Sequence, residues 1–312
     1  MTIPVFSVVV PVHNAAATLA ATLESVRGQT ETDFELVAID DGSTDASLSI
    51  LLDFAARDAR IRIVSRSNKG VAATRNLGVE LGTGSLIAFL DADDIWHPDK
   101  LARHRQFHAE SPDAAASYAR IAFIDSAPRQ LAARTISSIS PQPLGVIDLL
   151  GENPVCTMSN LVVARAAMTM IGQFDETMSH AEDQEWLMRA AAQRHIITGI
   201  DEVLVDYRLS PDGLSVDLGR MLDGWRTLAA RYGDATPTSV PMQAAEAVYC
   251  RYLARRALRS GASARVALGY ARRGLRLDAR AFLADARRGW LTLFSTLVAQ
   301  GLPRPVRLRL FA

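Results

Sequence analysis

The chain has 312 residues, and its 34 Lys and Arg are balanced by 34 Asp and Glu. This length suggests one large domain or a domain with an appendage, because single domains mostly run to about 100–200 residues. Hydrophobic residues at 49% and charged residues at 22% exclude wholesale disorder. No apolar run reaches the roughly 20 residues of a membrane-spanning helix, the N-terminus lacks the features of a secretory signal, and two cysteines cannot form a disulfide framework. We therefore expect a cytoplasmic protein.

The charges are unevenly distributed along the chain. Residues 1–215 hold 17 basic and 28 acidic side chains, whereas residues 216–312 hold 17 arginines and 6 acidic side chains. An acidic front followed by a basic tail indicates two regions with different partners. We predict domains at 1–215 and 216–312.

The first 97 residues alternate between strand and helix patterns. Strands are predicted at 6–12, 34–39, 61–64 and 85–90, and helices at 15–27, 46–59 and 71–81. Continuous apolar runs such as 6–12 are typical of strands buried on both faces. This order requires parallel strands joined by right-handed crossovers, with helices on both faces of the sheet. The fold class is therefore α/β, and residues 1–97 form the first half of its domain.

The rest of the chain is less regular and then becomes helical. Between 98 and 215, strands are predicted near 116–124, 161–163 and 203–208, and helices at 98–109 and about 182–193. We expect this second half to continue the sheet and to close the far side of a cleft. From residue 216 the predicted elements are helices at 218–231, 242–258, 262–275 and 279–298.

Polar residues follow three of the predicted strands directly. They are His13 and Asn14, Asp40 and Asp41, and Asp91, Asp93 and Asp94. In an open parallel sheet, ligands bind at the carboxyl ends of the strands. Five neighbouring carboxylates are costly without compensating cations, and their oxygens suit Mg²⁺ or Mn²⁺, which can bridge a diphosphate. Asp41 to Asp45 alone also fits a turn and a helix cap, so both interpretations stay open there.

Two other phosphate-binding motifs are excluded. Residues 82–85, GTGS, have no following lysine and precede a strand, so they do not form a P-loop. No GxGxxG follows the first strand, which disfavours a dinucleotide fold of the usual kind.

An ordered set of motifs resembles the family 2 glycosyltransferases, which are inverting enzymes with the GT-A fold. The motifs are SVVVPVHN at 7–14, QT at 29–30, IDDGSTD at 39–45, NKG at 68–70, ATRNLG at 73–78, FLDADD at 89–94, NP at 153–154, GQFDE at 172–176 and EDQEW at 182–186. The resemblance covers about residues 5–210. Each piece is weak by itself, but the set in this order is specific.

The resemblance implies a role for each matching residue. It places Pro11, Asp41, Lys69 and Gly70 around the base and ribose of a nucleotide, with Asp41 accepting the uracil imide N–H and His13 and Asn14 beside the pocket. Asp91 would lie near the ribose, Arg75 would position Asp91 or the diphosphate, and Asp93, supported by Asp94, would hold the divalent cation. Asp183 would be the general base.

Other positions are less determined. Trp186, one helical turn after Glu182, would stack on an acceptor sugar or belong to the core, and Glu182 and Glu185 also fit solvated helix charges. Many family members have a histidine two residues after the Tyr-Arg of the last strand, where this chain has Ser210, so Arg208 or water would substitute. His97, His104 and His108 are interpreted as surface helix residues, and Cys156 as a packing residue.

The resemblance favours transfer of a sugar from a nucleotide-diphospho-sugar, with a UDP-sugar expected, to a saccharide or lipid-linked glycan. Such a transfer needs one carboxylate base and a stabilised diphosphate leaving group. Two alternatives remain: a nucleotidyltransferase, and a catalytically degenerate sugar-nucleotide-binding scaffold.

The basic tail at 251–309 interleaves arginines with apolar residues such as Trp290 and Phe294. This composition fits either peripheral contact with the inner face of the cytoplasmic membrane or packing against the acidic front. It contains no recognised nucleic-acid-binding module, so we expect no nucleic-acid partner.

Overall fold

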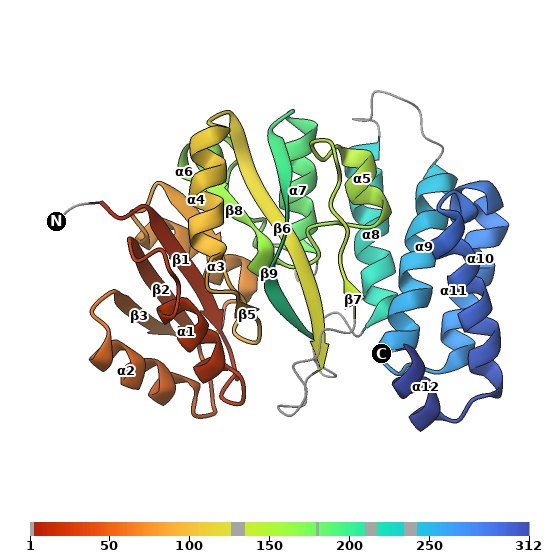
Figure 1. The fold of residues 1–312 in the computed structure, drawn as a ribbon, viewed down its shortest axis with the longest axis horizontal. Helices are drawn as coiled ribbons and strands as arrows, with labels where there is room; N and C mark the ends of the chain where they lie inside the picture. Colours follow the sequence, from red (N-terminus) through yellow and green to blue (C-terminus); the bar gives the residue numbers. More distant parts are fainter. Residues whose placement is uncertain (1–2, 126–134, 179–180, 210–216, 234–241, 312) are drawn as a thin grey trace. The chain divides into compact units, whose positions relative to one another are not determined.

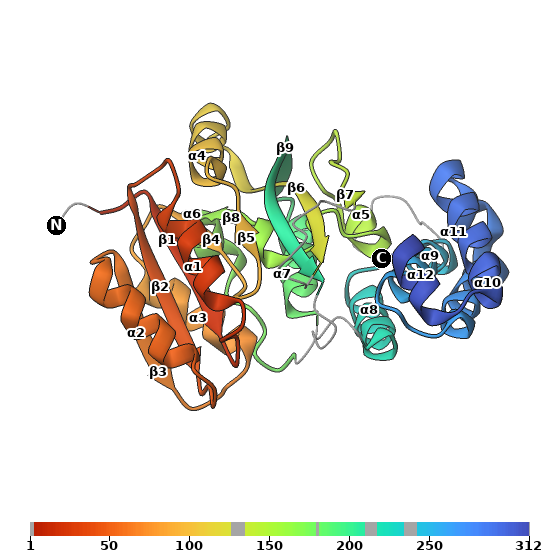
Figure 2. The same cartoon turned by 60° about the horizontal axis from the view of Figure 1, so that its bottom comes forward.

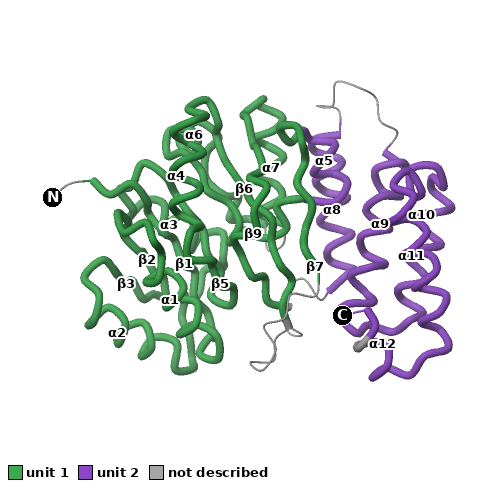
Figure 3. Tube along the Cα trace, in the orientation of Figure 1, with its two compact units in different colours: residues 1–144, 154–208 green, residues 145–153, 209–312 purple. Residues whose placement is uncertain are grey.

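The computed structural model describes residues 3–125, 135–178, 181–209, 217–233 and 242–311. The chain forms two compact units (Figure 3). Unit 1 contains residues 1–144 and 154–208, and unit 2 contains residues 145–153 and 209–312. Unit 1 holds the sheet and unit 2 is helical (Figure 1).

The first half of unit 1 has the expected alternating order. Its elements are β1 (Phe6–Val12), α1 (Leu19–Arg27), β2 (Phe34–Asp41), α2 (Ser47–Arg57), β3 (Ile61–Arg66), α3 (Val71–Leu81) and β4 (Leu86–Phe89). The four strands run parallel in the order β3-β2-β1-β4. This arrangement confirms the predicted α/β class.

Helices cover both faces of this parallel half (Figure 2). Successive side chains of a strand point to opposite faces. Val8 and Val10 of β1 belong to the core cluster that also contains residues of α1 and α2. Val9 faces the other way and meets α3 at Gly78, where an added Cβ would lie 2.3 Å from the valine Cγ1. A glycine is therefore needed for α3 to lie this close to the sheet.

The second half extends the same sheet with antiparallel strands. Its elements are β5 (Ile95–Trp96), α4 (Lys100–Glu110), β6 (Ala114–Asp125), β7 (Thr135–Ile136), the 3₁₀ turn η1 (Met158–Asn160), β8 (Val162–Ala164), α6 (Arg165–Ile171), α7 (Glu182–Ala192) and β9 (Ile196–Leu209). The sheet order continues β4-β8-β6-β9-β5, with β7 beside β6. The two-residue β5 follows the acidic motif and pairs with β9, so it brings the end of β4 next to the end of β9.

Unit 2 is built from α5 (Val146–Gly151), α8 (Leu218–Tyr232), α9 (Met242–Arg259), α10 (Ala264–Leu283), α11 (Ala286–Val298), the 3₁₀ turn η4 (Ala299–Gly301) and α12 (Arg304–Phe311). Within this unit, Glu152 accepts hydrogen bonds from Arg251 at 3.1 Å, Arg255 at 3.1 Å and Arg288 at 3.2 Å. The indole N–H of Trp225 donates to the Leu150 carbonyl at 2.7 Å. These contacts attach α5 to the C-terminal helices.

One predicted helix of unit 2 is divided in two. The sequence predicted a single helix at 279–298. The chain leaves helical geometry at Asp278, so a new helical segment does begin at residue 279, but it ends at residue 283 as the last part of α10. The next helix begins after Asp285, whose side chain caps it by accepting the Arg288 N–H at 2.9 Å. Asp278 caps its following segment in the same way, by accepting the Ala281 N–H at 2.9 Å, and the pattern alone did not show the second break at Asp285.

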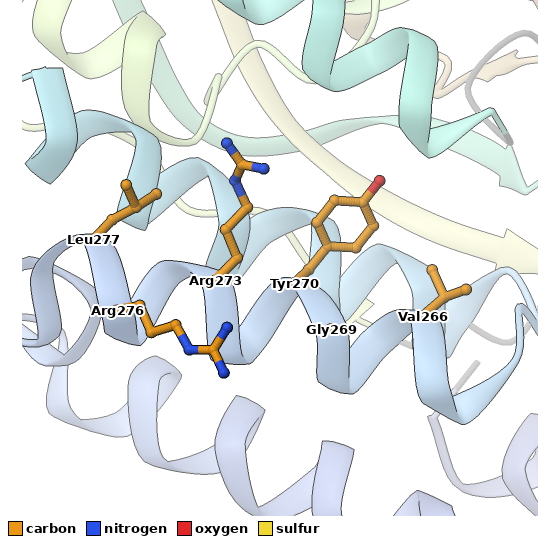
Figure 4. A pocket seen from close by; sticks show the side chains of 6 residues that line it. All are labelled: Val266, Gly269, Tyr270, Arg273, Arg276 and Leu277. Atoms are coloured by element: carbon orange, nitrogen blue, oxygen red, sulfur yellow. The ribbon is translucent and has the colours of Figure 1, made fainter.

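A shallow groove of about 540 Å³ lies on α10 (Figure 4). Its lining residues are Val266, Gly269, Tyr270, Arg273, Arg276 and Leu277. None of these belongs to the sequence-predicted site. Within the described residues, no helix is long and apolar enough to cross a membrane.

Candidate active site

The predicted site residues of unit 1 lie at or just after the ends of β1, β2 and β4, near the end of β9, in the loop before α3, on α3 and at the start of α7. Because β1, β2 and β4 are adjacent and parallel, their carboxyl ends share one edge of the sheet. Pro11 lies near the end of β1, and His13 and Asn14 follow that strand. The fold therefore supplies the strand ends that the sequence predicted.

Asp41, at the end of β2, holds the loop that leads into α3. Its Oδ1 accepts the backbone N–H of Lys69 at 3.0 Å and the Arg66 Nε–H at 3.0 Å. Its Oδ2 accepts the backbone N–H of Gly70 at 2.9 Å. Gly70 has φ +90°, a conformation that favours glycine, and it precedes α3. Asp41 thus fixes the backbone of the predicted nucleotide loop.

His13 and Asn14 brace the neighbouring loop. The imidazole Nδ1 of His13 lies 2.9 Å from the Asp41 carbonyl oxygen. Asn14 Oδ1 accepts the backbone N–H of Thr44 at 2.8 Å. Asn14 has φ +51°, which asparagine tolerates better than most residues. Both side chains are exposed, and together they link β1 to the loop after β2.

Arg75 of α3 joins the two acidic segments of the site. Its guanidinium donates to Asp91 Oδ1 at 2.8 Å and to Glu182 Oε1 at 2.7 Å. Burial by itself lowers the pKa of Arg75, but the Asp91 and Glu182 carboxylates outweigh burial and raise this pKa above its usual value. The arginine therefore stays charged and connects the end of β4 to the start of α7.

Asp183 is the second residue of α7, beside this ion-pair network. Its Oδ1 accepts the backbone N–H of Gln184 at 2.8 Å. Burial, with the negative charge of Glu182, raises the pKa of Asp183 to about 6, although Arg75 opposes the shift. A carboxylate with this pKa can accept a proton near neutral pH.

The acidic motif after β4 contains two different carboxylates. Burial and the charge of Asp91 raise the pKa of Asp93 to about 6, and no side-chain hydrogen bond to its carboxylate is found among the described residues. Asp94 is fully buried, and burial raises its pKa well above the usual range. Its Oδ1 accepts the Arg208 backbone N–H at 3.0 Å, and its Oδ2 accepts the Ser159 hydroxyl at 2.5 Å. Asp94 therefore organises the loop, whereas Asp93 retains free acceptor capacity.

The donor atoms fit a divalent cation. Mg²⁺ and Mn²⁺ prefer oxygen ligands, and such ions are often held by one or two carboxylates together with substrate phosphates. Asp91 and Asp93 repel each other, and a cation would relieve this repulsion. Across the described ranges, no group of three or more His, Cys, Asp or Glu side chains forms a metal-binding cluster. The remaining ligands would have to come from substrate and water.

Thr157 and Ser159 also belong to the site, although the sequence did not predict them. The Thr157 hydroxyl lies 3.2 Å from both Asp91 Oδ2 and Asp94 Oδ2. Ser159 Oγ also accepts the Asp91 backbone N–H at 2.9 Å. These residues lie more than 60 positions after the acidic motif. The one sequence signal that could have indicated them is the Thr-x-Ser spacing, in which Thr157 comes just before η1 and Ser159 lies within it.

Arg208 and Asn76 also hold the site together. Arg208 Nε donates to the Asp93 carbonyl at 2.8 Å, so the arginine braces the acidic loop from β9. The Asn76 amide donates to the Phe174 carbonyl at 3.0 Å and accepts the Phe174 N–H at 2.9 Å. It thereby ties the segment before α7 to α3. Ser210 lies outside the described residues.

Burial decides the roles of three side chains on α7. Of the two roles left open for Trp186, the structure supports the core role: Trp186 is fully buried and donates its indole N–H to the Gly172 carbonyl at 2.9 Å, so its ring has no face open for a sugar. Glu182 and Glu185 are not solvated helix charges: both are buried and paired, with Arg75 and Arg189.

His104 is likewise not a surface residue. It is fully buried, with Nε2 3.0 Å from Lys100 Nζ and Nδ1 2.7 Å from Ser117 Oγ. Burial lowers the pKa of Lys100 to about 7. His97 is partly exposed and pairs with Asp206, and Cys156 packs against the core cluster as expected.

The chain belongs to glycosyltransferase family 2. The family model described as Glycosyl transferase family 2 matches residues 7–169, just over half of the chain. The matched residues include β2, β4, nearly all of β1 and the acidic motif that follows β4, so the family match covers the strand ends described above.

Relatives in the same enzyme class support this assignment. A glycosyltransferase of Haemophilus influenzae is 33% identical over 163 residues, covering 52% of this chain and 63% of that protein. A PGL/p-HBAD biosynthesis glycosyltransferase of Mycobacterium bovis is 44% identical over 112 residues, covering 35% of this chain and 44% of that protein. A glycosyltransferase of Rickettsia felis is 43% identical over 105 residues, which are 34% of this chain but only 17% of that protein.

Two solved structures show the fold at lower identity. S. aureus TarS (residues 1–349), solved in complex with UDP, has a TM-score of 0.59 and 19% identity, covering 93% of this chain and 89% of that one. The mannosyltransferase PcManGT of Pyrobaculum calidifontis, solved with GDP-Man and Mn²⁺, has a TM-score of 0.61 and 21% identity, covering 99% and 88%. Both likenesses extend over nearly the whole chain.

Proposed function

We propose that this glycosyltransferase transfers a sugar from a UDP-sugar to a hydroxyl of a saccharide or lipid-linked glycan, with inversion at the anomeric carbon. The observation that carries the proposal is the network Asp91–Arg75–Glu182 beside Asp183. It brings a carboxylate of suitable pKa near the acidic motif at the strand ends. The catalytic and binding roles below are part of this proposal.

Asp183 acts as the general base. As the acceptor oxygen attacks the anomeric carbon, Asp183 takes its proton, and the bond from that carbon to the diphosphate oxygen breaks. The leaving group departs as a nucleoside diphosphate. Arg75 keeps Asp91 and Glu182 in place, and its charge together with the helix N-terminus favours the ionised form of Asp183. A single carboxylate base suffices, because a diphosphate is a good leaving group and needs no acid.

Asp93, with Asp91 beside it, would hold a divalent cation, and Asp94 would support the loop from behind. When bound, Mg²⁺ or Mn²⁺ supplies positive charge that stabilises the diphosphate. PcManGT, whose structure contains Mn²⁺, supports the choice of ion.

Uracil is the proposed base. Asp41 Oδ2 accepts one hydrogen bond among the described residues, from Gly70, and a carboxylate oxygen can accept two. The remaining lone pair could accept the imide N–H, while Pro11, His13, Lys69 and Gly70 would line the base and ribose. TarS, solved with UDP, supports this choice, whereas PcManGT, solved with GDP-Man, shows that the fold also serves guanine nucleotides.

Calorimetric titration tests the donor and the metal together. We expect UDP to bind more tightly than GDP in Mn²⁺, and the affinity to fall at least tenfold in EDTA and in Asp93→Ala, since both remove a charge-assisted contact to phosphate. GDP preference would overturn the role of Asp41, and equal binding in EDTA would overturn the metal site.

Turnover with a UDP-sugar panel tests the chemistry. Asp183→Asn should bind UDP normally but lose at least about a hundredfold in rate, the contribution typical of a general base. Glu185→Gln on the same helix turn is the control and should lose stability but not turnover per folded molecule. Release of pyrophosphate would indicate a nucleotidyltransferase instead, and UDP binding without turnover would indicate a scaffold.

A lipid-linked acceptor would place the enzyme peripherally on the inner face of the cytoplasmic membrane. The basic, partly apolar segment 251–309 motivates this part of the proposal.

A further inference from the structure

Helix α11 exposes most of its large apolar side chains instead of burying them in the core of unit 2. The residues that it buries in unit 2 are small or polar: Gly289, Thr292 and Thr296. The exposed side, which we call the outer face of α11, consists of Trp290, Leu291, Phe294, Leu297 and Val298. Phe294 is 67% exposed and Trp290 is 59% exposed. A helix shaped only by packing within unit 2 would have the reverse orientation.

The sequence spacing makes this face continuous. The five residues occupy positions i, i+1, i+4, i+7 and i+8, which fall on one side of a helix. Helix α12, which follows in the chain, has two exposed apolar side chains of its own, Val306 and Leu310. Contiguous exposed apolar patches of this kind mark interaction surfaces.

Charge decides which partner fits. Residues 279–312 contain six arginines and one acidic residue, Asp285. Arg287, at the start of α11, and Arg304, at the start of α12, are exposed. A second copy docked through the same surface would bring these like charges together, because a twofold interface is self-complementary. An anionic bilayer accepts the apolar side chains and attracts the arginines at once.

The sequences of the stretches outside the described residues are short and mostly polar or small. The stretches that the structure does not describe are at most nine residues long, and the longest, 126–134, has Leu131 as its single large apolar residue.

We propose that the outer face of α11 is a membrane-docking surface that inserts its apolar side chains into the interface of an anionic bilayer. The helix lies in the membrane plane, with Trp290 at the level of the headgroups and the arginines at the lipid phosphates. This inference deepens the peripheral location in the proposed function, but it does not depend on the transfer chemistry.

Tryptophan fluorescence offers a site-specific test. Trp96, Trp186 and Trp225 are at most 2% exposed, so Trp290 is the one exposed tryptophan of the four. The full chain is mixed with vesicles of phosphatidylcholine containing phosphatidylglycerol, and with vesicles of phosphatidylcholine alone. We expect co-flotation and a blue shift with the anionic vesicles, both weakened by salt. Trp290→Phe should still float but lose the blue shift.

Paired variants separate the face from the rest of the surface. Phe294→Ser with Leu297→Ser should lower vesicle partition by roughly a hundredfold, since burying each side chain contributes roughly tenfold. Arg287→Gln with Arg304→Gln should lower the preference for anionic vesicles, by roughly fivefold for each arginine. The matched control is Leu52→Ser in α2, an equally exposed leucine, which should float like the unchanged chain.

UDP titration of every variant shows whether the catalytic unit is intact. Three results would overturn the docking surface: no flotation of the full chain, undiminished flotation of the Phe294 and Leu297 variant, or equal loss in Leu52→Ser. A dimer in solution that the Phe294 and Leu297 variant abolishes would assign the face to a second copy instead. Failure of UDP binding with flotation intact would count against the proposed function alone.

Discussion

Arg75 determines the electrostatics of the candidate site at the scale of single residues. It is the cation shared by Asp91 and Glu182, which lie on segments more than 90 positions apart in the chain. The sequence could predict the individual carboxylates, because each follows a strand or begins a helix. It could not predict that Glu182 is paired rather than solvated, or that Thr157 and Ser159 bind Asp91 and Asp94, because those contacts depend on tertiary folding.

The pKa of Asp183 leads to a pH-dependent prediction. Its pKa is raised to about 6 by burial and by Glu182, and a general base acts only when ionised. We therefore expect kcat/KM to rise with pH up to about 6 and then level off. In Glu182→Gln, the negative charge that raises the pKa of Asp183 is lost, whereas Arg75 still lowers this pKa. The acid limb of the kcat/KM profile should therefore move to lower pH. Rate profiles of the two proteins at saturating metal check this. A limb that moves to higher pH would show that Glu182 does not face Asp183.

The elements of the first half followed from the sequence because their signals are local. Apolar runs, helical spacing and the parallel crossover rule together predicted the elements from β1 to β4. The second half could be predicted only in outline. The strand β5 has two residues, too few for a period, and β9 extends to 14 residues where only 203–208 had a strand signal. Their pairing fixes them, and pairing cannot be read from a single segment.

The close approach of α3 to β1 leads to a prediction at the same scale. In Gly78→Ala the new methyl would overlap Val9, whose Cγ1 is 2.3 Å from the Cβ position. Overpacking of this kind costs about 1–3 kcal/mol of the free energy of unfolding. Because α3 also carries Arg75, we expect UDP affinity or turnover to fall as well. Denaturant titration measures the stability change.

Gly269→Ala in α10 is the control, since no atom lies within 4 Å of its Cβ position. It should stabilise the chain by about 0.5–1 kcal/mol, the usual gain for alanine in a helix interior. A loss in both variants would show that the close contact with Val9 is not the cause.

The division of the whole molecule into two units does not follow the chain. Residues 145–153 come from the middle of the sequence but belong to the helical unit 2. The sequence placed the change at residue 216 because charge and helical pattern change there. It could not reveal that α5 packs on α9, because six helical residues carry little periodic signal.

Glu152 is the residue that joins this inserted segment to unit 2, and it leads to the last prediction. Three arginines from α9 and α11 converge on its carboxylate, and Arg251 is buried. Glu152→Gln would remove this counterion from Arg251 and Arg255, while Arg288 keeps its pair with Asp285 at 3.3 Å. Breaking a buried pair such as the one with Arg251 costs about 3–5 kcal/mol. Hydrogen exchange should therefore rise in α5, α9 and α11 while β1 and β2 stay protected.

Glu202→Gln is the control. It removes an exposed ion pair with Arg103 and should change the free energy of unfolding by at most about 1 kcal/mol. Equal exchange throughout both units in Glu152→Gln would mean that the two units unfold as one.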